Sequence, residues 1–137
     1  MGKSADSGKS GNKRILIIDS DESSRKPLAC ALSEENFRVE TAGQGHEAVK
    51  KIERYSPDLI VLDMMLPDAG SYEVLRRLQE RDVAAIPIII VTDRDADLAA
   101  SERLRQEPNV IACLQKPIQE AALSIMLRRI LNAKASI

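Results

Sequence analysis

The sequence predicts an α/β fold in which a parallel β-sheet is covered by helices on both faces. Short runs of Ile, Leu and Val alternate along the chain with longer segments whose apolar residues recur every three or four positions. Five such strand–helix pairs follow one another within 137 residues. Because parallel strands joined by short connections need crossover helices, this alternation predicts a single parallel sheet.

The predicted strands differ in how apolar they are. Three of them, at 14–18, 58–62 and 86–91, are almost continuously apolar, as expected of strands that are buried on both faces. The strand at 37–41 alternates apolar and polar residues, which is typical of a half-buried edge strand. The last strand is predicted at 110–114.

Five segments are predicted to be helices, four from apolar residues at helical spacing and one, at about 95–106, as a polar helix. These segments are 23–35, 45–55, 70–80, 95–106 and 118–132. Ser23 or Ser24 can cap the start of the first helix, and Pro27 falls near its first turn. In the last helix, the apolar residues expected on the buried side are Ile118, Ala122, Ile125, Met126 and Ile130.

Composition and charge exclude several classes of function. Apolar residues make up 44% of the chain and charged residues 30%, which is ordinary for a globular domain. The net charge of −1 provides no general attraction to nucleic acid or to an anionic membrane. No apolar run approaches the roughly 20 residues of a membrane span, and the N-terminus lacks the apolar stretch of a signal peptide. We therefore expect a cytoplasmic domain without direct nucleic-acid or membrane partners.

The chain is predicted to hold one domain at 13–134. Residues 1–12 are rich in Gly, Ser and Lys and are expected to be disordered, as a tail, a linker or an expression remnant. Cys30 and Cys113 lie far apart, without partners at metal-ligand spacing. We interpret them as buried thiols in a reducing compartment.

Polar residues follow the ends of four predicted strands. Asp19 comes after the first strand, Asp63 after the third and Thr92 after the fourth, and Lys116 comes shortly after the fifth. The carboxyl ends of parallel strands meet at one edge of a sheet, where ligands bind in this class of fold. This set of groups suits phosphoryl transfer to a carboxylate. One carboxylate attacks, the other holds a divalent cation such as Mg²⁺, and the hydroxyl and ammonium bind phosphoryl oxygens.

Four segments resemble the receiver domains of two-component response regulators. Residues 58–67, DLIVLDMMLP, resemble the phosphoacceptor segment of that family, and 86–92, IPIIIVT, are similar to its fourth strand. Residues 15–19, ILIID, resemble its first strand and first acid, and Lys116-Pro117 resembles its signature Lys-Pro. The resemblance covers nearly the whole predicted domain. It implies a flavodoxin-like, doubly wound (βα)5 sheet with the strand order 2-1-3-4-5.

The resemblance also implies roles for individual residues. Asp63 would be the phosphoacceptor, while Thr92 and Lys116 would contact the phosphoryl group. Mg²⁺ would be held by Asp19, Asp63 and the backbone carbonyl of Met65. The family often has a cis peptide bond between the residues that correspond to Lys116 and Pro117.

The chain departs from the family pattern at several functional positions. Ser20 stands where receivers usually have a second acid, so it is a weak candidate ligand and Mg²⁺ affinity is expected to fall. Asp93 replaces a small residue after Thr92, and Cys113 replaces the aromatic residue that couples phosphorylation to the surface. Gly70-Ser71 stands where the family has Asp-Gly.

Three functions follow from these observations. The first is a receiver that accepts a phosphoryl group on Asp63 from a histidine kinase or a phosphotransfer protein and signals through its surface to an output domain or partner protein. It would have no enzymatic activity beyond its own phosphorylation and dephosphorylation. The second is a pseudo-receiver, a protein-interaction module that does not use phosphate, which Ser20, Asp93 and Cys113 favour. The third is a flavodoxin-like enzyme or nucleotide binder, against which the chain lacks glycine-rich phosphate loops and has few aromatic residues.

Overall fold

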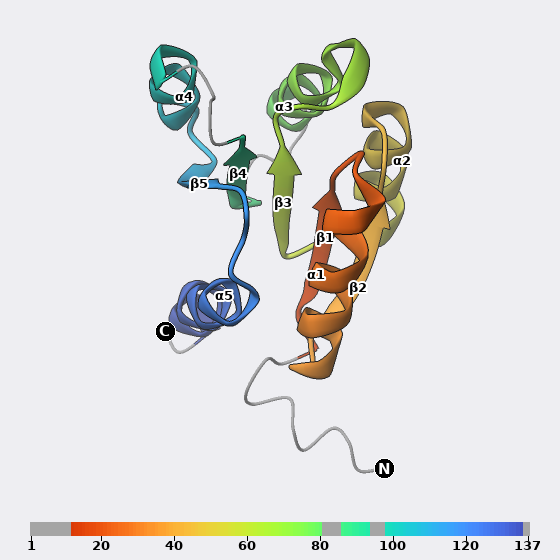
Figure 1. Ribbon diagram of the computed structural model, residues 1–137, viewed down its shortest axis with the longest axis vertical. Helices are drawn as coiled ribbons and strands as arrows, with labels where there is room; N and C mark the ends of the chain where they lie inside the picture. The colour runs from red at the N-terminus through yellow and green to blue at the C-terminus, as the bar shows by residue number, and fades with distance from the viewer. Residues whose placement is uncertain (1–11, 81–85, 94–97, 136–137) are drawn as a thin grey trace.

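A five-stranded parallel sheet forms the centre of the computed structural model, which describes residues 12–80, 86–93 and 98–135 (Figure 1). The strands are β1 (Arg14–Ile18), β2 (Arg38–Ala42), β3 (Leu59–Asp63), β4 (Ile88–Thr92) and β5 (Val110–Gln115). Their order is β2-β1-β3-β4-β5, and every neighbouring pair is parallel. The predicted fold class and strand order are therefore confirmed.

Helices cover both faces of this sheet. They are α1 (Glu22–Glu34), α2 (Gly45–Tyr55), α3 (Gly70–Glu80), α4 (Leu98–Arg105) and α5 (Glu120–Ala135), with a short 3-10 turn, η2 (Pro67–Ala69), before α3. In Figure 1, α2, α3 and α4 lie along one side of the sheet, and α1 and α5 lie along the other. Alternate strand residues feed the two cores: Leu16 and Ile18 face α2 and α3, whereas Ile15 and Ile17 face α1 and α5.

Burial follows the apolar pattern of β1 to β4, whereas the apolar residues of the edge strand β5 are half-buried or exposed. Every residue of β3 and β4 is buried, including the polar residues at their ends, Asp63 and Thr92. The edge strand β2 alternates between exposed and half-buried residues, as its sequence predicts. None of the helices in the described part of the chain has the length and apolar character needed to cross a bilayer.

The start of α1 differs from the prediction. Its N-cap is Asp21, whose side chain accepts a hydrogen bond of 3.0 Å from the backbone amide of Ser23. The helix therefore begins at Glu22, and Pro27 lies within the helix, beyond its first turn. A carboxylate and a serine hydroxyl are both good N-caps, so local sequence left the choice between neighbouring residues open.

The buried face of α5 also differs from the prediction. Leu123, Leu127 and Leu131 are its buried residues against the sheet, whereas Ile125 is 52% exposed. Ala122 is exposed as well, and the remaining predicted positions, Ile118, Met126 and Ile130, are only partly buried. The helix has apolar residues on two adjacent stripes, and only packing against the sheet selects the leucine stripe.

The prediction for the two cysteines is wrong, and two other predictions fall largely outside the described residues. Cys30 is exposed on α1 and Cys113 is half-buried on β5, so the prediction of two buried thiols is wrong. Cys30 falls outside the stripe that Leu28 and Leu32 bury against the sheet. The predicted N-terminal tail and the beginning of the predicted 95–106 helix lie largely outside the described residues.

Candidate functional site

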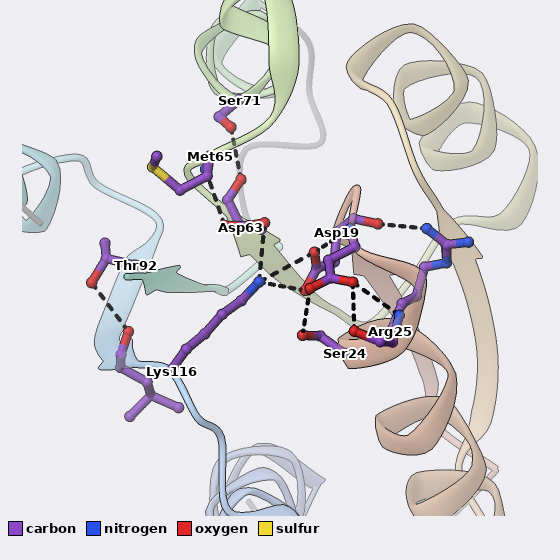
Figure 2. Close-up of polar contacts among 11 residues, drawn as sticks. Asp19, Ser24, Arg25, Asp63, Met65, Ser71, Thr92 and Lys116 are labelled. Carbon is purple, nitrogen blue, oxygen red and sulfur yellow. Dashed lines mark hydrogen bonds and ion pairs between the residues drawn. The ribbon is translucent and has the colours of Figure 1, made fainter. Parts of the chain in front are cut away.

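Three of the four predicted site residues meet at the carboxyl ends of the strands. Asp19 follows β1, Asp63 ends β3, and Lys116 follows β5. The Lys116 Nζ atom lies 3.1 Å from Asp19 Oδ2 and 3.4 Å from Asp63 Oδ2 (Figure 2). One ammonium group therefore bridges two carboxylates that are 44 positions apart in the sequence but on neighbouring strands. The peptide bond between Lys116 and Pro117 is cis, as the family resemblance implies.

Backbone amides hold the Oδ1 atoms of both carboxylates, and Lys116 Nζ also lies 3.3 Å from Asp19 Oδ1. Asp63 Oδ1 accepts a hydrogen bond of 3.0 Å from the amide of Met65. Asp19 Oδ1 accepts one of 2.8 Å from the amide of Asp21. Both carboxylates are therefore oriented by the loop that directly follows their own strand, and both turn toward Lys116.

Burial makes the Asp63 carboxyl unusual. The residue is only 2% exposed, and the pKa of Asp63 is raised from 3.8 to about 6, with burial as the largest cause. The neighbouring Asp19 contributes to this rise, while the Met65 amide and Lys116 oppose it. Burial alone would lower the pKa of Lys116, but its hydrogen bonds and charge interactions with Asp19 and Asp63 outweigh that effect and raise it. The lysine is therefore a permanent cation at neutral pH.

Thr92 does not join this cluster. It lies at the same edge of the sheet, but its hydroxyl donates to the backbone carbonyl of Leu114 over 3.4 Å (Figure 2). Thr92 thus shares the edge of the sheet with the other three residues, as predicted, but its hydroxyl binds β5. The reason is the register of β4 and β5, which pairs Thr92 with Gln115 and so places a carbonyl of β5 within reach.

Comparisons with known proteins decide what kind of site this is. Residues 15–128 match the family described as the response regulator receiver domain. The chain belongs to this family. The receiver is 35% identical to the transcriptional regulatory protein AfsQ1 of Streptomyces coelicolor over 86% of its own length and 51% of that protein. It is 41% identical to the alkaline phosphatase synthesis transcriptional regulatory protein PhoP of Bacillus subtilis over 63% of its own length and 35% of that protein.

Solved structures agree with this assignment. A CheY-like receiver domain from Methanospirillum hungatei is 28% identical, covers 90% of this chain and 97% of its own, and superimposes with a TM-score of 0.79. The receiver thus matches an isolated receiver domain over nearly its whole length, but spans about half the length of AfsQ1. The prediction of a response-regulator receiver is confirmed, and these comparisons give no evidence for the pseudo-receiver.

Receiver domains in general bind Mg²⁺ at the acidic pocket that this cluster occupies. Here the donor set is small. Among the residues that the structure describes, no group of three or more His, Cys, Asp and Glu side chains is arranged to hold a metal ion. Ser20 is exposed, and the carboxylate of Asp21 accepts hydrogen bonds from the amide and the hydroxyl of Ser23. The two carboxylates of Asp19 and Asp63 suit Mg²⁺, which keeps several waters and needs few protein ligands.

Two residues around the receiver pocket were not given a role from the sequence. Arg25 donates from Nη1 to the backbone carbonyl of Asp19 at 2.7 Å, and its guanidinium lies against Gly43, where a side chain would come within 3.0 Å of it. Ser71 donates to the backbone carbonyl of Asp63 at 2.7 Å. The only signal in the sequence was a departure from the family pattern at Gly70-Ser71, which points to the position but not to its contact.

Proposed function

We propose that this receiver accepts a phosphoryl group on Asp63 from a histidine kinase or a histidine-containing phosphotransfer protein. The observation that carries the proposal is a buried carboxylate at the end of a strand, which shares one ammonium group with a second acid. An Asp63 oxygen forms a bond to phosphorus while the P–N bond to the donor imidazole breaks. The electron pair leaves with the imidazole nitrogen, which takes a proton.

Lys116 and Thr92 would bind the oxygens of the transferred group. Lys116 is the most exposed member of the cluster, so its ammonium can move from Oδ2 of Asp63 onto a phosphoryl oxygen without leaving the pocket. Among the described residues, the hydroxyl of Thr92 has only a long hydrogen bond, 3.4 Å, to give up. Rotation of this side chain toward Asp63 would then bring the fourth predicted group to the site.

Mg²⁺ would be held by Asp19, Asp63 and the backbone carbonyl of Met65, and it would supply positive charge for the transferred oxygens. We propose that Mg²⁺ binding is weakened here because Ser20 offers a neutral hydroxyl where receivers have a carboxylate. Asp21 is not a ready substitute, since its carboxylate caps α1.

The partners that follow from this function are proteins. The phosphorylated receiver would act on an output domain or a separate protein through its surface, in the cytoplasm. It would not bind nucleic acid or membrane directly, in keeping with a net charge of −1. It would catalyse no reaction beyond its own phosphorylation and dephosphorylation.

Incubation with acetyl phosphate and Mg²⁺ tests the acceptor. We expect the intact mass to increase by one phosphoryl group in the native chain and to stay unchanged in Asp63→Asn. Asp58→Asn is a matched control, because Asp58 precedes the same strand at its opposite end and binds the backbone amide of Arg14. Absence of an adduct in the native chain would favour the pseudo-receiver.

A further inference from the structure

Ser71 is tied directly to the residue that carries the phosphoacceptor carboxylate. It lies in the first turn of α3, is 1% exposed, and donates its hydroxyl to the backbone carbonyl of Asp63 at 2.7 Å (Figure 2). The loop between the two residues is thus closed by a side-chain hydrogen bond. No role in phosphoryl transfer follows for this position from the family pattern, which has glycine there.

The hydroxyl helps to fix one peptide plane. The carbonyl oxygen of Asp63 and the amide nitrogen of Met64 belong to the same rigid peptide group. Ser71 binds the carbonyl at 2.7 Å, and the carbonyl of Val91 on β4 accepts from the Met64 amide at 2.9 Å. Because the plane is held at both of its polar atoms, its rotation about the chain direction is restricted.

The start of α3, which carries Ser71, is held in place by close packing against α2. Gly45 at the start of α2 and Gly70 at the start of α3 are in close contact, and a Cβ atom on Gly45 would lie 2.7 Å from Cα of Gly70. No side chain larger than hydrogen fits between these helix ends without a shift of backbone. The two helices therefore fix the position of Ser71 relative to the sheet.

We propose that Ser71 is a positioning residue for the phosphoacceptor, an inference that rests on the proposed phosphorylation of Asp63. The Met65 amide holds Oδ1 of Asp63, and Lys116 lies at Oδ2. With the peptide plane fixed by Ser71, Oδ2 is aimed at the ammonium group and is the oxygen that attacks phosphorus. Without the hydroxyl, the carboxylate would sample orientations in which this oxygen is not aimed at the incoming group.

The test compares phosphorylation rates by acetyl phosphate, in the presence of Mg²⁺, over a range of donor concentrations. We expect Ser71→Ala to lower the limiting rate about tenfold, because misplaced reacting groups lose rate steeply, and to leave the half-saturating donor concentration unchanged. Ser71→Thr keeps the hydroxyl and should restore most of the rate. Ser124→Ala is the matched control, since Ser124 is also buried but its hydroxyl has no hydrogen-bond partner in the described structure.

Each outcome either supports or overturns the proposal. Equal limiting rates for the native chain and Ser71→Ala would overturn it, and so would a change confined to the half-saturating concentration or an equal loss in Ser124→Ala. If the extra methyl group of Ser71→Thr prevents folding, as judged by circular dichroism, Ser71→Cys takes its place as a weaker donor with an intermediate rate. A native chain without any adduct would instead remove the proposed function, and the role of Ser71 with it.

Discussion

Asp58 and Asp63 flank the same strand, but the structure uses them in different ways. Asp58 precedes β3, is half-buried, and accepts one hydrogen bond of 2.8 Å from the backbone amide of Arg14 on β1. Asp63 ends β3, is buried, and shares the ammonium of Lys116 with a second carboxylate. One end of the strand thus has a satisfied structural contact, whereas the other has two acids and one cation.

This difference shows how a fold creates a reactive carboxylate. At the Asp58 end, a single acid meets a backbone donor, and the contact holds two strands together. At the Asp63 end, burial beside Asp19 makes the ionised carboxylate unfavourable. A nearby cation or protonation of the carboxylate therefore stabilises this end of the strand. The same residue type becomes a structural or a chemical group according to what the neighbouring strand ends place beside it.

The largest expected effect on stability comes from the pKa of Asp63, which is raised from 3.8 to about 6. Because its pKa is higher in the folded state, the protonated acid stabilises that state. Its contribution to the free energy of unfolding is complete below pH 3.8 and is lost as the pH rises through about 6. The loss amounts to about 3 kcal/mol at most. We expect Asp63→Asn to lack this fall in the free energy of unfolding and to be more stable than the native chain at neutral pH.

Urea unfolding at a series of pH values measures this effect. Asp58→Asn serves as the control, because it should keep the pH dependence of the native chain. Parallel curves for the native chain and Asp63→Asn would show that ionisation of the buried Asp63 carboxyl does not destabilise the folded state.

A smaller effect should follow from removing the structural acid. Asp58→Ala leaves the Arg14 amide without its carboxylate partner, and a hydrogen bond to a charged group contributes about 2 kcal/mol. We expect the free energy of unfolding, measured by urea titration, to fall by this amount. The rate of phosphorylation by acetyl phosphate should not change. A reduced rate in correctly folded Asp58→Ala would mean that the two ends of β3 are coupled.

The smallest expected effect concerns Mg²⁺. Ser20→Asp restores the second acid of the family pattern, and we expect it to tighten Mg²⁺ binding about tenfold, since an added carboxylate ligand raises the affinity for this cation. Isothermal titration calorimetry measures the change. Ser33→Asp adds the same charge to an exposed position on α1 and should leave the affinity unchanged. Equal affinities in Ser20→Asp and the native chain would show that residue 20 does not face the metal.

The helices show where local sequence was not enough. The apolar spacing of α2 correctly predicted the helix from residue 45 to residue 55, because its other face is almost entirely polar. In α5, the prediction named Met126 and Ile130, which pack against the core, but missed the fully buried stripe of Leu123, Leu127 and Leu131. At the start of α1, three neighbouring residues could all act as caps, and Asp21 was missed because Ser23 and Ser24 fit the same rule.

The sequence by itself determined the strands, the order in which they alternate with helices, and the presence of Asp19, Asp63 and Lys116 at strand ends. The continuous apolar runs of β1, β3 and β4 are buried in the sheet, and the polar residue that follows or ends each run lies at its edge. Only the tertiary structure decided that Lys116 bridges the two acids, that Thr92 binds a carbonyl of β5, and that Ser71 holds the backbone of Asp63. These contacts depend on strand register and on the close approach of α2 and α3, which join distant parts of the chain and leave no periodic pattern in it.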